Sequence, residues 1–408
     1  MEQQELIPHL FRTEFARITA VLCGRFGIAN VELAEDLTSE TFLAALNTWP
    51  YKGVPQNPQA WLYTVAKNKA RNVLNRQKLH DDKILAVLQE ETLEHQEMDL
   101  DLSEANIIDS QLQMLFAVCH PAIPAEGQIG LALRVLCGFG IDEIASAFLS
   151  NKETINKRLF RAKEKLRTNQ VKMAFPPEKE LNSRLQPVLT TLYLLFNEGY
   201  YSETGNDILR QELCFEAMRL VRMLLDYKPT NKPQVNALFA LMCFHASRFE
   251  ARKAGNGEFV LYEDQDENLW NHELISQGAF YLHQASQGNT ISRYHLEAGI
   301  AYWHTIKTDT EEKWSNILHL YNHLLSIDYS PIAALNHTFA LAKVKGNEVA
   351  IHEAEKLQLS NNPYYHTLLG ELYKPISLDK AKGHFNQALN LVKSSIEKNA
   401  ILSKINAM

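Results

Sequence analysis

The stretch from Ile141 to Arg167, IDEIASAFLSNKETINKRLFRAKEKLR, constrains the fold most, because its apolar residues keep helical spacing on both sides of a short polar break. In the first segment Ile144 and Ala145 follow Ile141 at three and four residues, which places all three on one face of a helix. Ser150 followed by Glu153 forms a capping box, so a second helix is expected to begin there. The spacing predicts a helix-turn-helix, with Leu149 filling the turn.

The second helix has two different faces. One is a narrow apolar stripe made of Ile155, Leu159, Ala162 and Leu166. Glu153, Thr154, Lys157, Phe160 and Arg161 point roughly the other way. Short polar groups near the N-terminus of a helix, with cations further along, suit insertion into a DNA major groove. An ordinary helical hairpin with a solvated charged face is equally compatible with this stretch alone.

Length and composition indicate a globular protein of two to four domains, since 408 residues exceed one compact core. Hydrophobic residues make up 46% and charged residues 22%, and the net charge of −7 does not exclude a locally basic surface. The N-terminus has acids where a signal peptide needs cations, and no apolar run approaches membrane-spanning length. Five scattered cysteines lack zinc spacing, so reduced thiols in a cytoplasmic protein are expected: Cys23, Cys119, Cys137, Cys214 and Cys243.

Three helices are expected in the N-terminal region, followed by a change of charge. Periodicity predicts a helix from Pro8 to Cys23 and another from Val31 to Trp49, where Glu35, Asp36 and Glu40 form an acidic patch. A proline-rich loop follows, over residues 51–58. Residues 61–78 contain no acid, and their cations and asparagines are Lys67, Asn68, Lys69, Arg71, Asn72, Asn75, Arg76 and Lys78.

This basic helix, with Trp61 near its start, indicates a nucleic-acid surface, because cations meet phosphate and aromatic rings stack on unpaired bases. A solvated basic face with Trp61 in the core is the alternative. Residues 81–108 are strongly acidic, which predicts an extended or partly helical linker. A second module, residues 109–170, then opens with two helices divided by Pro121 and Pro124.

The order of these parts resembles an extracytoplasmic-function sigma factor of the sigma-70 family. AEDLTSETF resembles the helix that binds core RNA polymerase, which implies polymerase contacts by Glu35, Asp36, Ser39 and Glu40. NPQAWLYTVAKNKARNVLNR resembles the element that opens and reads the −10 region, which implies contacts by Asn57, Trp61, Lys67, Asn68, Arg71, Asn75 and Arg76. The helix-turn-helix resembles the region that reads the −35 element, which implies contacts by Lys152, Glu153, Thr154, Asn156, Lys157, Arg158 and Arg161. The chain departs from the family pattern at Ser39, where glutamine is usual, and at Asn72, where an acid is frequent.

The remainder, residues 171–408, resembles the tetratricopeptide-like helical extension of one sigma subgroup, through LYLLFNEGYYSETG, HASRFEAR and EDQDENLW. A helix pair is predicted around Gly346. A second pair is predicted to interlock small and large residues, namely Leu369, Gly370 and Tyr373 with Ala381, Phe385 and Ala388. Stacked helix pairs present a concave face for proteins or peptides. The acids at 263–267, with His245 and His272, permit a metal or acid-base site, although we expect them to cap a helix beginning near Asn268.

The sequence therefore predicts an all-α sigma factor that binds core RNA polymerase and promoter DNA, catalyses no reaction and uses no cofactor, metal or membrane. Residues 8–80 are expected to be region 2, 81–108 the linker, 109–170 region 4, and 171–408 the regulatory extension. Two alternatives remain: a DNA-binding regulator that never joins polymerase, and a protein-binding scaffold with a degenerate DNA-binding end. For the extension we expect either a separate protein partner or intramolecular docking on the sigma modules, through the helix end at 192–205 and the surroundings of Arg248, Arg252 and Asp266.

Overall fold

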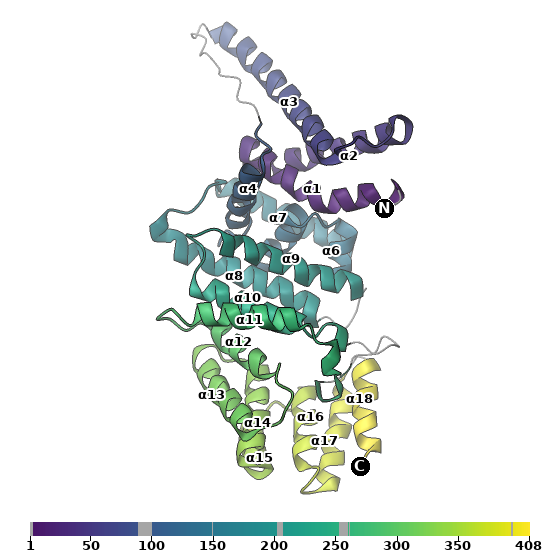
Figure 1. Ribbon diagram of the computed structural model, residues 1–408, viewed down its shortest axis with the longest axis vertical. Helices are drawn as coiled ribbons and strands as arrows, with labels where there is room; N and C mark the ends of the chain where they lie inside the picture. Colours follow the sequence, from purple (N-terminus) through teal and green to yellow (C-terminus); the bar gives the residue numbers. More distant parts are fainter. Residues whose placement is uncertain are drawn as a thin grey trace. The chain divides into compact units, whose positions relative to one another are not determined.

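The structure is a computed structural model that describes residues 3–88, 100–148, 150–201, 207–252, 260, 262–392 and 395–408. All elements within these ranges are helices, so the all-α prediction is confirmed (Figure 1). Contacts divide the chain into two compact units, Met1–Thr230 and Asn231–Met408.

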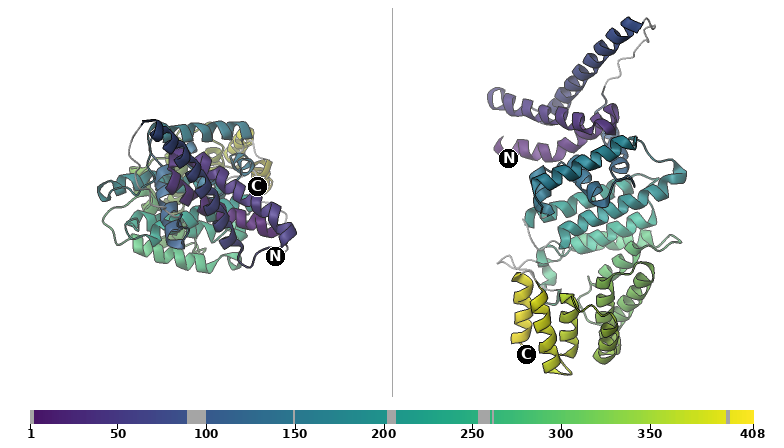
Figure 2. Two further views of the ribbon diagram at one scale, coloured as in Figure 1. Left: turned by 90° about the horizontal axis from the view of Figure 1, so that it is seen from above. Right: turned by 180° about the vertical axis from the view of Figure 1, so that it is seen from behind.

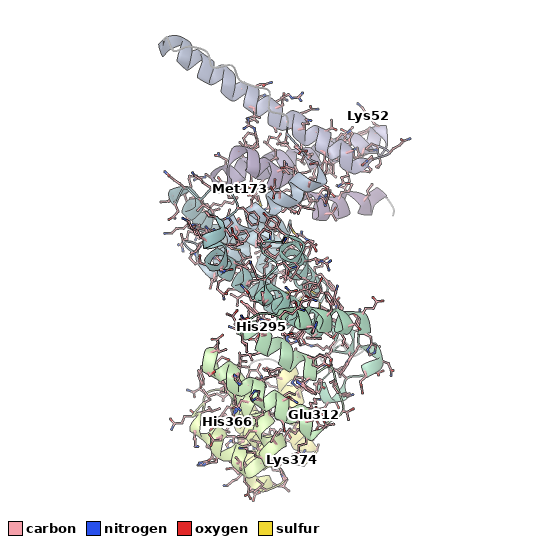
Figure 3. The ribbon with its side chains drawn as sticks, turned by 60° about the vertical axis from the view of Figure 1, so that its left-hand side comes forward. Lys52, Met173, His295, Glu312, His366 and Lys374 are labelled. Atoms are coloured by element: carbon pink, nitrogen blue, oxygen red, sulfur yellow. The ribbon has the colours of Figure 1, made fainter. Side chains whose placement is uncertain are left out.

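The N-terminal module of the first unit consists of α1 (Gln3–Phe26), η1 (Ile28–Asn30), α2 (Val31–Lys52) and α3 (Pro58–Leu88). Aromatic contacts hold it together: the Phe11 and Phe42 rings lie 5.0 Å apart, and the Trp49 and Trp61 rings lie 5.4 Å apart. The predicted loop is shorter than expected, because α2 continues through Pro50 to Lys52, which is labelled in Figure 3. Gly53, whose φ of 80° suits glycine, ends the helix.

The predicted acidic linker is partly helical at both ends. α3 continues beyond Lys78 to Leu88, and α4 (Glu104–Val118) already begins at Glu104. Ser103 caps α4, since its hydroxyl accepts a hydrogen bond from the Asn106 N–H at 3.5 Å. Residues 89–99 of the predicted linker lie outside the described residues.

The second module contains α4, α5 (Ala125–Leu131), the π-helical turn η2 (Ala132–Leu136), α6 (Ile141–Ala147) and α7 (Lys152–Thr168). The predicted division at Pro121 and Pro124 is confirmed. The predicted cap is wrong by one residue, because the Thr154 N–H donates to Asn151 Oδ1 at 2.8 Å and α7 therefore begins after Asn151, not after Ser150. Leu149, predicted to fill the turn, lies outside the described residues.

The first unit extends past residue 170 to include α8 (Glu178–Tyr201) and α9 (Asp207–Asp226), which pack on α4, α5 and α6. Figure 2 shows these helices from behind. The Arg184 guanidinium donates to the Phe116 carbonyl at 2.8 Å, and Thr191 Oγ1 donates to Gln128 Oε1 at 2.7 Å. The compact unit thus ends at Thr230, and α8 and α9 pack against the helices of the second module.

The second unit is built from helices alone in its described ranges. They are α10 (Pro233–Ala246), η3 (Glu250–Arg252), η4 (Tyr262–Asp264), η5 (Glu267–Leu269), α11 (His272–Ala285), α12 (Arg293–Trp303), α13 (Glu311–Ile327), α14 (Pro331–Lys345), α15 (Asn347–Lys356), α16 (Pro363–Tyr373), α17 (Leu378–Leu391) and α18 (Ser395–Asn406). α11 begins later than predicted, with Asn271 as its cap, while Asp266 caps η5.

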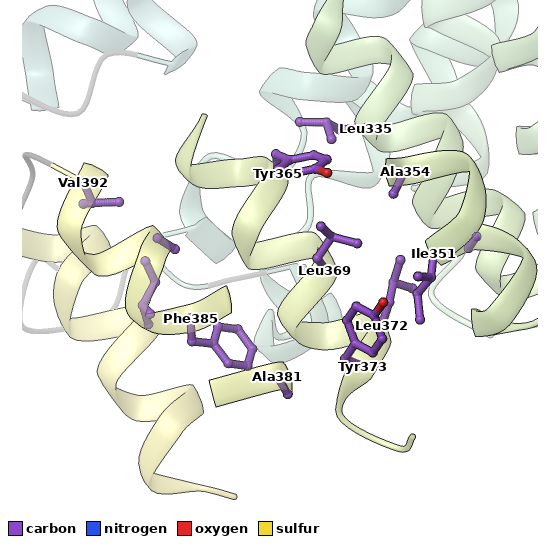
Figure 4. Packing of buried hydrophobic residues seen from close by; sticks show 13 residues of the cluster. Leu335, Ile351, Ala354, Tyr365, Leu369, Leu372, Tyr373, Ala381, Phe385 and Val392 are labelled. Atoms are coloured by element: carbon purple, nitrogen blue, oxygen red, sulfur yellow. The ribbon is translucent and has the colours of Figure 1, made fainter. Parts of the chain in front are cut away.

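Two predicted helix pairs are present in this unit. Gly346, with a φ of 87°, separates α14 from α15. Leu369 and Tyr373 of α16 face Ala381 and Phe385 of α17 in one buried cluster (Figure 4). The small and large residues therefore interlock as the spacing predicted.

Candidate polymerase and promoter interfaces

The outer face of α2 combines acidic and apolar side chains. Asp36 and Glu40 are exposed and Ser39 is half-buried. Leu43 and Leu46 follow on the same side, 54% and 49% exposed, although leucines on a folded helix usually face the core. Glu40 Oε2 accepts a hydrogen bond from Lys69 Nζ of α3 at 2.8 Å, which ties the two helices together. This face, residues 36–46, is the first candidate interface.

Glu35 does not belong to that exposed face. Its side chain is only 8% exposed and accepts hydrogen bonds from Arg134 Nε at 2.6 Å and from Lys163 Nζ at 2.7 Å. The sequence contained a signal for this position, because the buried residues Val31, Thr38 and Phe42 share one helical stripe with Glu35. The predicted acidic patch is therefore reduced to Asp36 and Glu40.

The exposed face of α3 carries amides and cations. Its members are Asn68, Arg71, Asn72, Asn75 and Arg76, spaced as one side of a helix. Lys67 is half-buried and lines an open pocket of about 340 Å³ with Tyr63 and Asp101. Asn57 caps the helix, since its Oδ1 accepts the Ala60 N–H at 3.0 Å. Trp61 is half-buried against Trp49, so its ring contributes to packing.

Tyr63, which sequence reasoning did not single out, fixes α3 against α1. Its hydroxyl donates to Glu14 Oε2 at 2.7 Å and accepts from Gln59 Nε2 at 2.8 Å and from Arg17 Nε at 3.2 Å. Burial, together with the bond to Glu14, raises the pKa of Tyr63 to about 12. Tyr63 therefore remains a neutral hydrogen-bonding group near neutral pH and orients the basic helix.

α7 has the two faces that the sequence predicted. Ile155, Leu159, Ala162 and Leu166 are all buried. The residues exposed on the other side are Lys152, Glu153, Thr154, Asn156, Lys157, Phe160 and Arg161. Lys152 pairs with Asp142 of α6 at 2.6 Å, and Lys157 pairs with Glu153 at 2.7 Å. Exposed pairs of this kind contribute little to stability and exchange easily for phosphate contacts.

Arg158 differs from the other predicted −35 residues. It is half-buried, pairs with Glu126 of α5 at 2.9 Å, and places its guanidinium 5.6 Å from the centre of the Phe148 ring. These contacts brace α7 against α5 and α6, so Arg158 lies beside the exposed face and does not belong to it.

The described ranges bring together no set of three or more histidine, cysteine, aspartate or glutamate side chains that could hold a metal ion. Within the same ranges each helix is too short or too polar to cross a lipid bilayer. All five cysteines are buried thiols.

Comparisons with known proteins agree with the N-terminal assignment. Residues 13–80, which form most of α1, all of α2 and most of α3, match sigma-70 region 2. Residues 184–286 match a family of unknown function, DUF6596, and this match continues past Thr230. The chain is 34% identical over 376 residues to an uncharacterized protein of Rhizobium meliloti (strain 1021), across 90% of this chain and 88% of that protein. No solved structure matches. The chain therefore belongs to the same family as the Rhizobium meliloti protein, and the match of residues 13–80 to region 2 supports a sigma-70 family member with a sigma-factor-like role in transcription initiation.

Proposed function

We propose that this protein is an extracytoplasmic-function sigma factor that binds core RNA polymerase and directs it to promoters with −35 and −10 elements. The match of residues 13–80 to sigma-70 region 2 carries the proposal. In it, residues 8–80 serve as region 2, residues 81–108 as the linker, residues 109–170 as region 4, and residues 171–408 as a tetratricopeptide-like regulatory extension.

The outer face of α2 is the proposed polymerase contact. Asp36 and Glu40 supply negative charge to a basic partner, and Leu43 and Leu46 supply apolar surface. In interfaces of this composition the apolar centre contributes affinity, and the charged groups determine which partner is bound.

The exposed faces of α3 and α7 are the proposed DNA contacts. On α3, Asn68, Arg71, Asn75 and Arg76 offer hydrogen bonds to phosphates and to separated bases. On α7, Thr154, Asn156, Lys157 and Arg161 are exposed at the N-terminal half and middle of the helix, where groove-reading residues lie in helix-turn-helix proteins.

A DNA-binding regulator that never joins polymerase is the main alternative, and run-off transcription separates the two. Purified protein is incubated with core polymerase and a library of promoter fragments. We expect defined transcripts that require both proteins. A regulator that acts without joining polymerase gives DNA binding but no polymerase-dependent transcripts.

Asp36→Arg combined with Glu40→Arg is expected to abolish association with core polymerase. Two reversed charges facing a basic surface create like-charge contacts that typically cost several kcal/mol (on the order of 3 or more). Co-purification with core polymerase is the measurement, and circular dichroism checks that the variant is still helical. Glu178→Arg with Glu180→Arg, exposed acids on α8, is the matched control. Normal co-purification of the Asp36 and Glu40 variant contradicts the proposed surface.

A further inference from the structure

Two sequence segments that the proposed function does not use lie together in the second unit. They are HASRFEAR, residues 245–252, at the end of α10, and EDQDENLW, residues 263–270, around η4 and η5. The Asn271 N–H donates to the Ser247 carbonyl at 2.8 Å. The guanidinium carbon of Arg248 lies 5.4 Å from the centre of the Tyr262 ring. Both segments therefore meet beside Tyr262.

Lys313, in the first turn of α13, reaches the same place. The residue is 0% exposed, and its Nζ donates to the Ile306 carbonyl at 2.6 Å and to the Tyr262 hydroxyl at 3.2 Å. Among the described residues Lys313 forms no ion pair. Lysine is almost never fully buried without an acid, and the positive end of the helix dipole disfavours a cation in a first turn. The Lys313 ammonium is therefore an uncompensated buried charge, and two of its three N–H donors are used.

The acids nearest to Lys313 are engaged elsewhere or exposed. Asp309 Oδ2 accepts a hydrogen bond from Lys343 Nζ at 2.9 Å, and Glu267 faces solvent. Burial lowers the pKa of Lys313 below its usual value, although Asp309 and Glu267 oppose this effect. Lys343 and Arg248 lower that pKa as well. The surroundings of the ammonium thus lack a negative charge that would stabilise it.

Two further buried groups beside Tyr262 have unused hydrogen-bonding capacity. The Trp270 and Tyr262 rings stack with their centres 6.3 Å apart, and the Gln265 N–H donates to the Tyr262 carbonyl at 3.4 Å. Trp270 and Gln265 are each 4% exposed, yet within the described ranges Trp270 Nε1 and Gln265 Oε1 have no hydrogen-bond partner. Buried polar groups are nearly always satisfied, so such exceptions point to a bound water, ion or ligand.

We propose that Lys313 and Trp270 bind a small oxyanion, a carboxylate or a phosphate, beside Tyr262. The anion supplies the counter-charge for the Lys313 ammonium and accepts a hydrogen bond from Trp270 Nε1, and such charge-assisted bonds are among the strongest in proteins. A hydroxyl group on the bound molecule donates to Gln265 Oε1. Tyr262 is only half-buried, so the anion approaches past its ring. The site is independent of the proposed function, since none of its residues belongs to the proposed polymerase or DNA contacts.

Hydrogen–deuterium exchange of the full-length protein, followed by peptide mass spectrometry, tests the site locally. Exchange is compared in about 20 mM potassium phosphate, in potassium acetate and in potassium chloride, all at one ionic strength. A ligand that binds only the folded state slows exchange by the factor 1 + [L]/Kd. With a Kd of about 1 mM, we expect peptides of α12 and α13 to exchange about twentyfold more slowly in phosphate or acetate than in chloride. Peptides of α4 and α5 report the general effect of each salt.

Lys313→Met removes the charge and keeps the length of the side chain. We expect this variant to lose the slowing by phosphate and acetate. In chloride it should exchange no faster than the parent, because an apolar side chain avoids the cost of an uncompensated buried charge. Lys345→Met, at an exposed lysine of α14, is the matched control and should respond to the anions as the parent does.

Trp270→Phe tests the second contact independently, because it keeps an aromatic ring and removes only the N–H donor. Loss of a hydrogen bond to a charged group weakens binding about tenfold, so the slowing should fall from about twentyfold to about threefold. An unchanged response of this variant removes Trp270 from the site.

The three salts identify the anion. Slowing by phosphate alone supports a phosphate site, slowing by acetate alone a carboxylate site, and slowing by both a site for either group. Equal exchange of the parent in all three salts overturns the proposal. Slowing that persists in Lys313→Met places the anion elsewhere and overturns the assignment. Faster exchange of Lys313→Met than of the parent in chloride shows that the folded unit already compensates the Lys313 charge, which also overturns the proposal.

Discussion

Gly370 and Gly383, in the neighbouring helices α16 and α17, have different surroundings. Substitutions at these two positions therefore test how α16 packs on α17. A Cβ at Gly370 in α16 would lie 2.8 Å from ring atoms of Phe385, whereas a Cβ at Gly383 in α17 would meet nothing within 4 Å. We expect Gly370→Ala to lower the free energy of unfolding by about 1–2 kcal/mol, because overpacking outweighs the gain in helix propensity. Gly383→Ala should raise it by up to about 1 kcal/mol. Thermal unfolding of both variants is the measurement, and an increase in stability for both would contradict the interlock.

The sequence predicted this interlock but not the burial of Glu35, and the reason is the range of the interactions. Gly370 and Phe385 belong to adjacent helices, so their size pattern is visible within one short segment. Glu35 is buried by Arg134 and Lys163, which are 99 and 128 residues away. Helical spacing puts Glu35 on the buried face of α2. Burial of its carboxylate is favourable only with a cationic partner, and that partner comes from another module.

At the scale of single elements, local periodicity predicted which residues share a helix face better than it predicted where each helix begins and ends. The stripe of α7 was predicted residue by residue, because helical spacing alone decides which side chains share a face. The cap at Asn151 and the extension of α3 to Leu88 were missed, since helix ends depend on which side chain reaches a free N–H and on tertiary contacts.

The junction between α12 and α13 contains a histidine that should make the second unit sensitive to acid. Burial, together with the charges of Arg248 and Lys313 and against the opposing charge of Asp309, lowers the pKa of His304 to about 3. In the unfolded chain the imidazole of His304 has a pKa near 6.5. As the pH falls from about 6.5 towards 3, the unfolded chain therefore binds a proton at this histidine and the folded unit does not. Stability is therefore fully present above pH 6.5 and is lost below it.

Between pH 7 and pH 5 the free energy of unfolding should fall by about 2 kcal/mol less in His304→Asn than in the parent. A histidine that stays neutral in the folded unit contributes about that amount to the fall. Chemical denaturation at the two pH values measures the difference. Part of the loss should persist, since burial also lowers the pKa of His245. An identical pH dependence of parent and variant would show that His304 titrates normally in the folded unit.

At the scale of the whole molecule, the sequence placed a domain boundary near residue 170 because the helix-turn-helix motif ends at Arg167. Packing continues to Thr230. Leu185, Val188, Leu189 and Leu192 of α8 are fully buried, and Arg219 of α9 donates to the Leu136 carbonyl at 2.8 Å. The helix-turn-helix region therefore depends on helices that its sequence motif does not include.

Two truncations should behave differently for this reason. A fragment that ends at Thr230 keeps α8 and α9, and we expect it to unfold in one cooperative transition near the temperature of the first unit in the full chain.

A fragment that ends at Arg167 loses the four buried side chains of α8. These contribute about 1.5–3 kcal/mol each, and their sum is comparable to the roughly 5–15 kcal/mol total stability of a domain. It also leaves the Phe116 and Leu136 carbonyls without their arginine donors. We expect this shorter fragment to bind an apolar dye and to lack a cooperative transition in calorimetry. Equal transition temperatures for the two fragments would show that α8 and α9 add nothing to the stability of the second module.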